Sequence, residues 1–238
     1  MAIAIVLAGT FSYRGPYGRT LMTPGSLLLG NAEACFSCGH EHGEGDRCLS
    51  FCFAVDVFER IAADAGARRA EFSQHRIVAS RATASVTTKA LQLMQAEADS
   101  QELAYSLAAL AVRLNQAVRT VKTNARDERR VIDVVRWIET TLAEPHTLET
   151  LAKRAHLSPY HFLRLFKAGV GTSPYQFILR ARLRTAARHL VTTDEPVTSI
   201  AATVGFADLA NFTRSFHAEL GMSPTRFRAS ANSAGARP

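Results

Sequence analysis

A segment of 80 residues, 148–227, contains the same pattern twice, at an offset of fifty residues. Eight positions carry the same residue in both copies: Ala152 and Ala202, Phe162 and Phe212, Arg164 and Arg214, Phe166 and Phe216, Gly171 and Gly221, Ser173 and Ser223, Pro174 and Pro224, and Phe177 and Phe227. A period of this length indicates a supersecondary unit that is repeated in space. We therefore expect two similar helical units in the C-terminal half of the chain.

Each copy predicts a helix, a short turn and a second helix. In the first copy, apolar residues fall at i, i+3, i+4 and i+7 from Leu148, which predicts a short amphipathic helix. Ser158 can then cap a new helix whose first position is Pro159, and Gly171 ends that helix. This order is the helix-turn-helix pattern, in which the second helix enters the major groove of DNA.

The second helix of each copy has an outward face that could read base edges. Arginine can bond guanine, asparagine can bond adenine, and apolar side chains can contact the thymine methyl group. The alternative is an ordinary solvated helix face, which the repetition of an arginine at equivalent positions disfavours. The candidate DNA-binding residues are Tyr160, His161, Leu163, Arg164, Leu209, Ala210, Asn211, Thr213 and Arg214.

A helix of about five turns is predicted between the two copies, over residues 173–191. Leu179, Leu183, Ala186 and Leu190 form its apolar stripe, while Arg180 and Arg184 line up on another face. We expect these two arginines to contact phosphate or an acidic partner, with a solvated face as an equally weighted alternative.

The residues from about 131 to 227 resemble the DNA-binding domain of the AraC/XylS family of bacterial transcription regulators. The motifs that carry this resemblance are Leu-Ala-Lys-Arg-Ala (151–155), Leu-Ser-Pro-Tyr-His-Phe-Leu-Arg-Leu-Phe-Lys (157–167), Gly-Thr-Ser-Pro-Tyr-Gln-Phe (171–177), Ile-Ala-Ala-Thr-Val-Gly-Phe (200–206) and the run 212–224. The resemblance implies seven helices, with two helix-turn-helix units joined by a long helix, and recognition of adjacent major-groove segments on one face of double-stranded DNA. Leu209 and Ala210 stand where relatives often carry polar residues, which implies weaker base selectivity there.

The length of 238 residues allows two modest domains, and the strand-like and helical segments together predict an α+β fold. The net charge of +7 is concentrated in residues 127–238, with 15 basic against 10 acidic residues, as a polyanion partner requires. We expect an N-terminal domain over 1–123, a linker over 124–130, a DNA-binding domain over 131–228 and a disordered tail over 229–238. The sequence has no apolar run long enough to span a membrane, and we expect a cytoplasmic protein.

The N-terminal domain is predicted to be a small β unit followed by helices. Short extended segments are expected at 3–7, 20–23, 26–29, 49–53 and 72–79, a helix at 56–65, and two helices within 83–121 that break near Asp99. By the family resemblance, this half is a partial cupin-like domain for effector sensing or dimerisation. The implied partners are a second copy of the chain and, for an activator, RNA polymerase.

All four cysteines lie between residues 35 and 52, close to two histidines. Thiolates and imidazoles that converge in this way can hold zinc or another transition metal, and the candidate ligands are Cys35, Cys38, His40, His42 and Cys48. Cys52 alternates with apolar residues and is assigned to the core. The equally weighted alternative is a structural turn that braces the β unit.

Three functions compete at this point. The leading hypothesis is a sequence-specific transcription regulator with a sensing or dimerising N-terminal domain, controlled by a metal, thiol or small-molecule signal. The second is a DNA alkyl-damage acceptor with a zinc-thiolate site, and the third is an architectural DNA binder without an effector. No catalytic triad or phosphate-binding glycine loop appears in the sequence, so we do not expect an enzyme.

Overall fold

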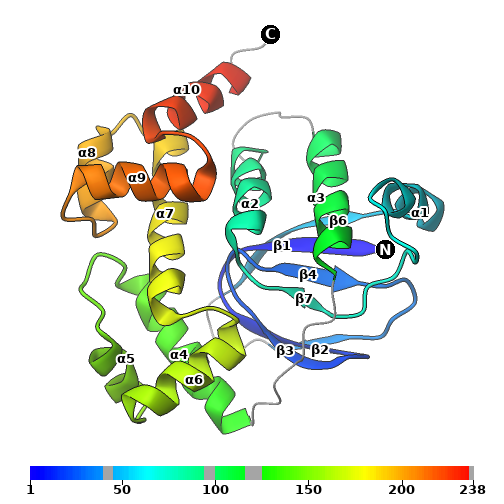
Figure 1. Ribbon diagram of the computed structural model, residues 1–238, viewed down its shortest axis with the longest axis horizontal. Helices are drawn as coiled ribbons and strands as arrows, with labels where there is room; N and C mark the ends of the chain where they lie inside the picture. The colour runs from blue at the N-terminus through cyan, green and yellow to red at the C-terminus, as the bar shows by residue number, and fades with distance from the viewer. Residues whose placement is uncertain (40–44, 94–99, 116–124, 236–238) are drawn as a thin grey trace.

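The computed structural model describes residues 1–39, 45–93, 100–115 and 125–235, and it contains a β-rich N-terminal part and a helical C-terminal part (Figure 1). A four-stranded sheet has the order β6-β1-β4-β7, and a three-stranded sheet has the order β3-β2-β5. All strand pairs are antiparallel. The strands are β1 (Ala2–Ala8), β2 (Phe11–Gly15), β3 (Gly18–Met22), β4 (Leu27–Gly30), β5 (Ser37–Gly39), β6 (Arg47–Cys52) and β7 (Arg76–Ile77).

Three helices pack against the four-stranded sheet and form one apolar core with it. They are α1 (Val55–Asp64), α2 (Arg81–Leu93) and α3 (Ser100–Leu114). Strand β1 supplies Ile3 and Ile5 to this core because alternate residues of a strand point to the same face. Phe58 of α1 and Phe72 lie edge to face with ring centroids 5.2 Å apart. The expected β unit with helices is therefore confirmed.

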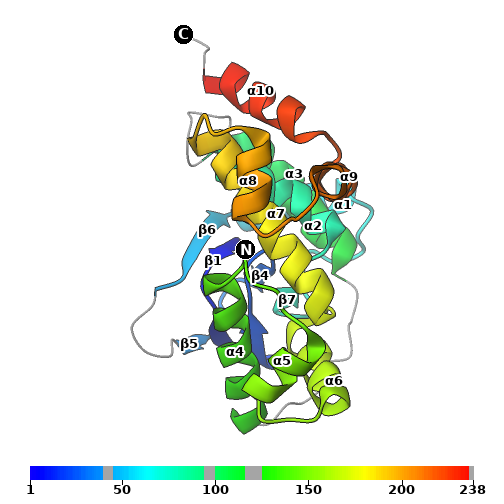
Figure 2. The same cartoon turned by 90° about the vertical axis from the view of Figure 1, so that its left-hand side faces the viewer.

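Over the described residues 125–235, the C-terminal part contains seven helices: α4 (Ala125–Thr140), α5 (Leu148–Arg154), α6 (Pro159–Val170), α7 (Pro174–Thr192), α8 (Val197–Thr203), α9 (Leu209–Leu220) and α10 (Pro224–Gly235). Helix α7 joins two units, with α5 and α6 at one end and α8 and α9 at the other (Figure 2). Each unit has its own apolar core. None of the helices in the described ranges is long and apolar enough to cross a membrane.

Four details of the sequence predictions need correction. Strands β2 and β5 were not predicted, and the extended segment expected over 72–79 pairs only at Arg76–Ile77. Residues 125–130, expected as a linker, form the first turns of α4, where Glu128 pairs with Arg19 of β3. Residues 229–235, expected to be disordered, continue α10 as a helix. The predicted break near Asp99, the end of the second helix beyond residue 115 and Asn124 of the linker lie outside the described residues.

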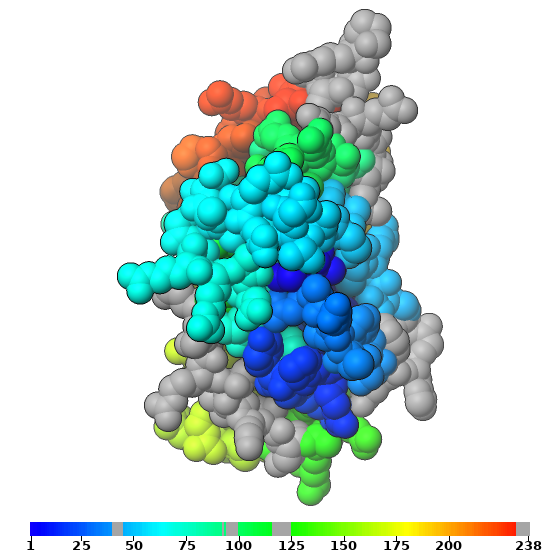
Figure 3. Space-filling model, turned by 90° about the vertical axis from the view of Figure 1, so that its right-hand side faces the viewer, coloured from blue at the N-terminus to red at the C-terminus, as the bar shows by residue number. Residues whose placement is uncertain are grey.

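The N-terminal part packs against both helical units. Leu21 of β3 belongs to the core of the first unit, and the buried carboxylate of Glu128 in α4 pairs with Arg19 Nε at 2.9 Å. The hydroxyl of Ser12 also donates to Glu128. Helix α2 contacts α7 and α9 of the second unit. The first 75 residues fill most of the face in Figure 3, where the C-terminal helices appear only along the upper and lower edges.

Candidate DNA-binding interface

Helices α6 and α9 occupy equivalent places in the two copies and begin and end by the same local rules. The hydroxyl of Ser158 accepts a hydrogen bond from the backbone N–H of His161 at 3.4 Å. At the equivalent position, the carboxylate of Asp208 accepts from the N–H groups of Ala210 and Asn211 at 3.0 and 2.9 Å. These caps satisfy amides that have no partner inside the helix.

Both helices end at a glycine in the left-handed conformation. Gly171 has φ of 87° and Gly221 has φ of 78°, a region that costs little only for residues without a Cβ. The N–H of each glycine donates to the carbonyl four residues earlier, on Lys167 and His217. The repeated glycines therefore set the length of both helices, as the sequence predicted.

The phenylalanines of the repeat form the same buried cluster in each unit. Three rings are involved in each copy, and all six side chains are almost fully buried. In the first copy, Phe162 and Phe166 lie 5.5 Å apart at 53°, and Phe166 and Phe177 lie 5.7 Å apart at 74°. In the second copy the equivalent values are 5.5 Å at 53° and 5.5 Å at 74°. This packing orients one face of each helix inward and leaves the other face to solvent.

The predicted DNA-binding residues lie on these outer faces. Tyr160 is 78% exposed, Leu209 is 42% exposed and Leu163 is 36% exposed. The two repeated arginines, together with Ala210 and Asn211, are also exposed, whereas His161 and Thr213 are half-buried. Within the described ranges, neither Arg164 nor Arg214 forms an ion pair or a hydrogen bond. Both guanidinium groups are therefore available to a ligand.

Asp208 was not among the predicted site residues, although it lies beside them. Its hydrogen bonds from the Ala210 and Asn211 amides lower the pKa of the carboxyl, and the positive charge of Arg214 lowers it further. The carboxylate is thus ionised at the start of α9, where the positive end of the helix dipole also stabilises it. The signal was present in the sequence, since aspartate is a preferred N-cap and precedes Leu209 where Ser158 precedes Pro159.

The joining helix α7 is tied to both units by Arg182. Its guanidinium donates to the carbonyl oxygens of Leu142 and Glu144, which follow α4, at 2.8 and 2.9 Å. It also donates to the carbonyl of Gly205, in the turn between α8 and α9, at 2.8 Å. One side chain therefore links the loop of the first unit to the turn of the second, a role that the sequence analysis missed.

Arg180 and Arg184 were expected to contact phosphate or an acidic partner, and the structure places them against partners within the chain. Arg180 Nε lies 2.8 Å from a carboxylate oxygen of Glu219, and its Nη1 donates to the carbonyl of Ala79 at 3.0 Å. Arg184 lies 3.6 Å from the carboxylate of Glu139. The N-terminal part covers this face of α7, so the two arginines face internal partners in place of solvent.

The cysteine cluster is only partly within the described residues, because His40 and His42 lie outside them. Cys35, Cys38, Cys48 and Cys52 are all exposed and free, so the core position predicted for Cys52 is wrong. Its side chain points to the outer face of edge strand β6. In the parts of the chain that can be described, no three His, Cys, Asp or Glu residues converge as metal ligands. The metal site stays a prediction.

In the metal-free chain, the thiols of Cys38 and Cys48 are not activated. Burial, a hydrogen bond to Asp46 and the charge of that carboxylate raise the pKa of Cys48 to about 12. Burial also raises the pKa of Cys38, and Asp46 contributes to the increase. Since the thiolate is the nucleophile and the metal ligand, both cysteines are held in the less reactive form.

Two equivalent capped helices, each with an exposed arginine on its outer face, define a double helix-turn-helix protein. A helix-turn-helix domain family matches residues 151–230. The probable transcription factor PqrA of Proteus vulgaris is 33% identical over 103 residues, which cover 42% of this chain and 84% of that protein. The chain belongs to the AraC/XylS family of transcription regulators.

Other relatives share only part of their length with this chain. An HTH-type transcriptional regulator of Mycobacterium tuberculosis is 40% identical over 83 residues, 35% of this chain and 32% of that protein. The bifunctional transcriptional activator and DNA repair enzyme AdaA of Bacillus subtilis is 33% identical over 122 residues, 50% of this chain and 58% of that protein. The DNA-binding domain of AdpA, solved in complex with a target DNA, has a TM-score of 0.43 at 34% identity, covering 44% of this chain and 94% of that chain.

Proposed function

We propose that this protein regulates transcription by placing α6 and α9 in successive major-groove segments of one operator. The observation that carries the proposal is the repeated outer face, on which Arg164 and Arg214 are exposed and without an ion pair in the described structure. An arginine in the major groove bonds the O6 and N7 atoms of guanine, and Asn211 is suited to adenine. The basic C-terminal half adds contacts with phosphate that do not depend on sequence.

The test begins with an operator selected from random-sequence DNA with the full chain. Arg164→Ala and Arg214→Ala should each weaken operator binding by ~1–3 kcal/mol and relax base preference at one position. Arg113→Ala is the matched control, because Arg113 is an exposed arginine of α3 in the N-terminal part. Fluorescence anisotropy at several salt concentrations measures both effects. If both variants bind the operator as tightly as the control does, the groove assignment is wrong.

The same measurement separates a regulator from an architectural DNA binder. A sequence-specific protein should bind its operator at least ~10³-fold more tightly than random DNA of equal length. Equal affinities would favour the architectural alternative. Activation through RNA polymerase and dimerisation through the N-terminal part belong to the same proposal, and in vitro transcription and light scattering test them.

We infer that the chain is a regulator without a repair activity of its own. AdaA combines both activities, so the comparison alone leaves the repair alternative open. An alkyl acceptor needs a reactive thiolate, and in the metal-free chain the raised pKa of Cys48 and of Cys38 favours the thiol. The test is mass spectrometry of the protein after incubation with methylated DNA. A gain of one methyl group on a cysteine would establish the repair activity.

A further inference from the structure

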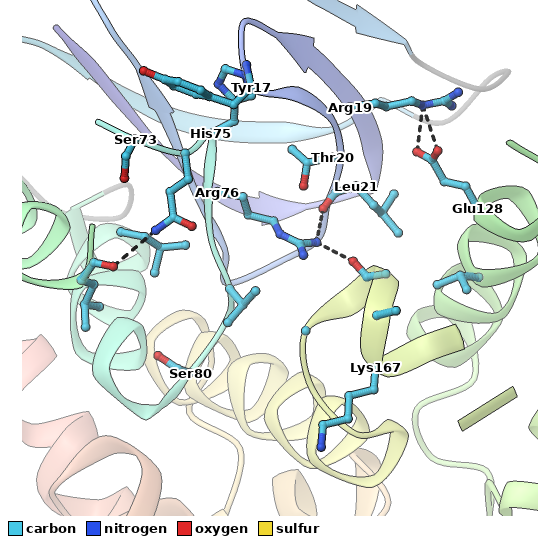
Figure 4. Close-up of a pocket in the computed structure, with 18 residues that line it drawn as sticks. Tyr17, Arg19, Thr20, Leu21, Ser73, His75, Arg76, Ser80, Glu128 and Lys167 are labelled. Carbon is cyan, nitrogen blue, oxygen red and sulfur yellow. Dashed lines mark hydrogen bonds and ion pairs between the residues drawn. The ribbon is translucent and has the colours of Figure 1, made fainter. Parts of the chain in front are cut away.

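A cavity of about 430 Å³ lies between strands of the two N-terminal sheets and the first helix-turn-helix unit (Figure 4). Strands β3 and β7 form one side of it, and helices α4 and α6 form the other. Its apolar lining includes Leu21, Ile77, Val78, Leu114 and Val131. This volume is within the range of small-molecule sites, and such sites are mostly apolar with a few placed polar groups.

The guanidinium of Arg76 is the charged group at the centre of this cavity. Its Nη1 donates to the carbonyl oxygens of Leu21 and Gly169 at 2.6 and 2.5 Å. Among the described residues, no acceptor bonds its Nε or Nη2 and no carboxylate pairs with it. Burial lowers the pKa of Arg76 to about 10, which still leaves the group charged at neutral pH. Within the part of the chain that the structure describes, this buried cation therefore has no counter-ion, and the Nε and Nη2 edge of its donors has no acceptor.

The other titratable groups of the cavity do not fill this role. The carboxylate of Glu128 is already bonded to Arg19 and Ser12. Burial lowers the pKa of His75, and its Nε2 accepts a hydrogen bond from the N–H of Tyr17 at 2.9 Å. The amino group of Lys167 points away from Arg76 (Figure 4). The free edge of Arg76 is thus the strongest anion-binding feature of the cavity.

Arg76 also connects the cavity to α6, the second helix of the first helix-turn-helix unit. Gly169 lies in the last turn of α6, where the carbonyl groups have no partner further along the helix. A guanidinium at this end satisfies such a carbonyl and interacts favourably with the helix dipole. Arg76 comes from β7, whereas Gly169 belongs to the helix that carries Arg164. The Arg76 side chain is therefore in direct contact with the C-terminal end of α6.

We propose that the cavity binds a small organic carboxylate whose head group pairs with the free Nε and Nη2 edge of Arg76 and whose apolar body contacts Leu21, Val78 and Val131. A planar carboxylate matches the fork of the guanidinium and forms two parallel hydrogen bonds. The apolar walls favour a hydrocarbon body over a second charge. The ligand contacts both parts of the chain, so its binding is coupled to the position of α6. That coupling rests on the proposed function, whereas the binding itself does not.

The binding test uses isothermal titration of the full chain with benzoate and hexanoate, and with benzamide and hexanamide as neutral controls. The acids should bind at least tenfold more tightly than the amides, because hydrogen bonds between two charged groups are stronger than those to a neutral amide. Arg76→Gln should remove this preference, whereas Arg113→Gln should retain it. Leu114→Trp fills the cavity without altering the guanidinium, and it should abolish binding of the acids even if Arg76→Gln fails to fold. Equal affinities for acids and amides, or no binding of either acid below millimolar concentration, would overturn the proposal.

The coupling test measures operator affinity by anisotropy with and without the acid that binds more tightly. A linked site requires that the acid changes operator affinity by the same factor by which operator DNA changes acid affinity. Acid binding by a chain that does not bind DNA would refute the proposed function and leave the carboxylate site in place. Operator binding without acid binding would refute the carboxylate site alone.

Discussion

Gly171 and Gly221 offer a direct test of the packing between the two parts of the chain. They occupy the same position in the two copies and have nearly the same φ, 87° and 78°. Their surroundings differ, however. A Cβ on Gly171 would lie 2.3 Å from Val78 Cγ1 and 3.0 Å from Val78 Cβ, whereas a Cβ on Gly221 would have no heavy atom within 4 Å. Val78 follows β7 and belongs to the N-terminal part.

The structure therefore predicts different costs for the same substitution. Gly221→Ala should lower the free energy of unfolding by ~1–2 kcal/mol, the cost of a left-handed conformation for a residue with a Cβ. Gly171→Ala carries that cost and an added ~1–3 kcal/mol for overpacking against Val78. The second substitution should thus cost about 2–5 kcal/mol by this reasoning.

Urea denaturation monitored by circular dichroism measures both variants. The fluorescence of Trp137, the single tryptophan of the chain, reports separately on the first helical unit. Val78→Ala in the Gly171→Ala background removes the methyl group at 2.3 Å and should recover part of the added cost, which appears as a coupling energy in the double-mutant cycle. Equal losses for Gly171→Ala and Gly221→Ala, with no rescue, would show that Val78 does not pack against this turn.

Three further predictions concern groups that hold the interface and its helices. Burial raises the pKa of Glu139 from its ordinary value of 4.5 to about 7, against the opposing effect of Arg184. The contribution of the protonated carboxyl to stability is therefore fully present below about pH 4.5 and is lost as the pH rises through 7. The free energy of unfolding of the wild type should decrease over this pH window, and Glu139→Gln should reduce that decrease in denaturation curves. The same pH dependence in the variant and the wild type would contradict the prediction. Ser158→Ala removes the N-cap of α6 and should cost ~1 kcal/mol in urea denaturation. Arg182→Ala should lower the free energy of unfolding by about 2 kcal/mol or more, since three carbonyls lose a charged donor. Operator affinity should fall as well. An unchanged operator affinity would show that the Arg182 hydrogen bonds are not needed for DNA binding.

The C-terminal fold could be predicted because its signals are local. The caps at Ser158 and Gly171 and the spacing of Phe162 and Phe166 act within one or two helical turns, and each signal occurs twice. The packing of the N-terminal part could not be predicted in the same way. Strand β5 exists only through its pairing with β2, and its three residues are exposed without alternation.

The exposed residues of the site, on the outer faces of α6 and α9, were predicted from the sequence. The contacts between the helical units and the N-terminal part were not. Helical periodicity identifies which side of α7 carries Arg180 and Arg184, but it does not reveal what covers that side. The same limit applies to Arg76, which appears in the sequence as one basic residue in an extended segment. Its carbonyl partners are 55 and 93 residues away along the chain. Strand β2 also was not predicted, but here a local signal existed, because the two-residue turn at Pro16 and Tyr17 connects β2 to β3.

The length of α7 has a consequence for the DNA that the protein can recognise. Its 19 residues span about 28 Å at 1.5 Å per residue, which is close to the pitch of the double helix, about 34 Å. Arg182, near the middle of α7, donates to the loop that follows α4 and to the turn between α8 and α9, so α7 holds the two units at a fixed separation. Five extra base pairs between the two half-sites of an operator would turn one half-site to the far side of the duplex, where α6 and α9 could not contact both half-sites at once.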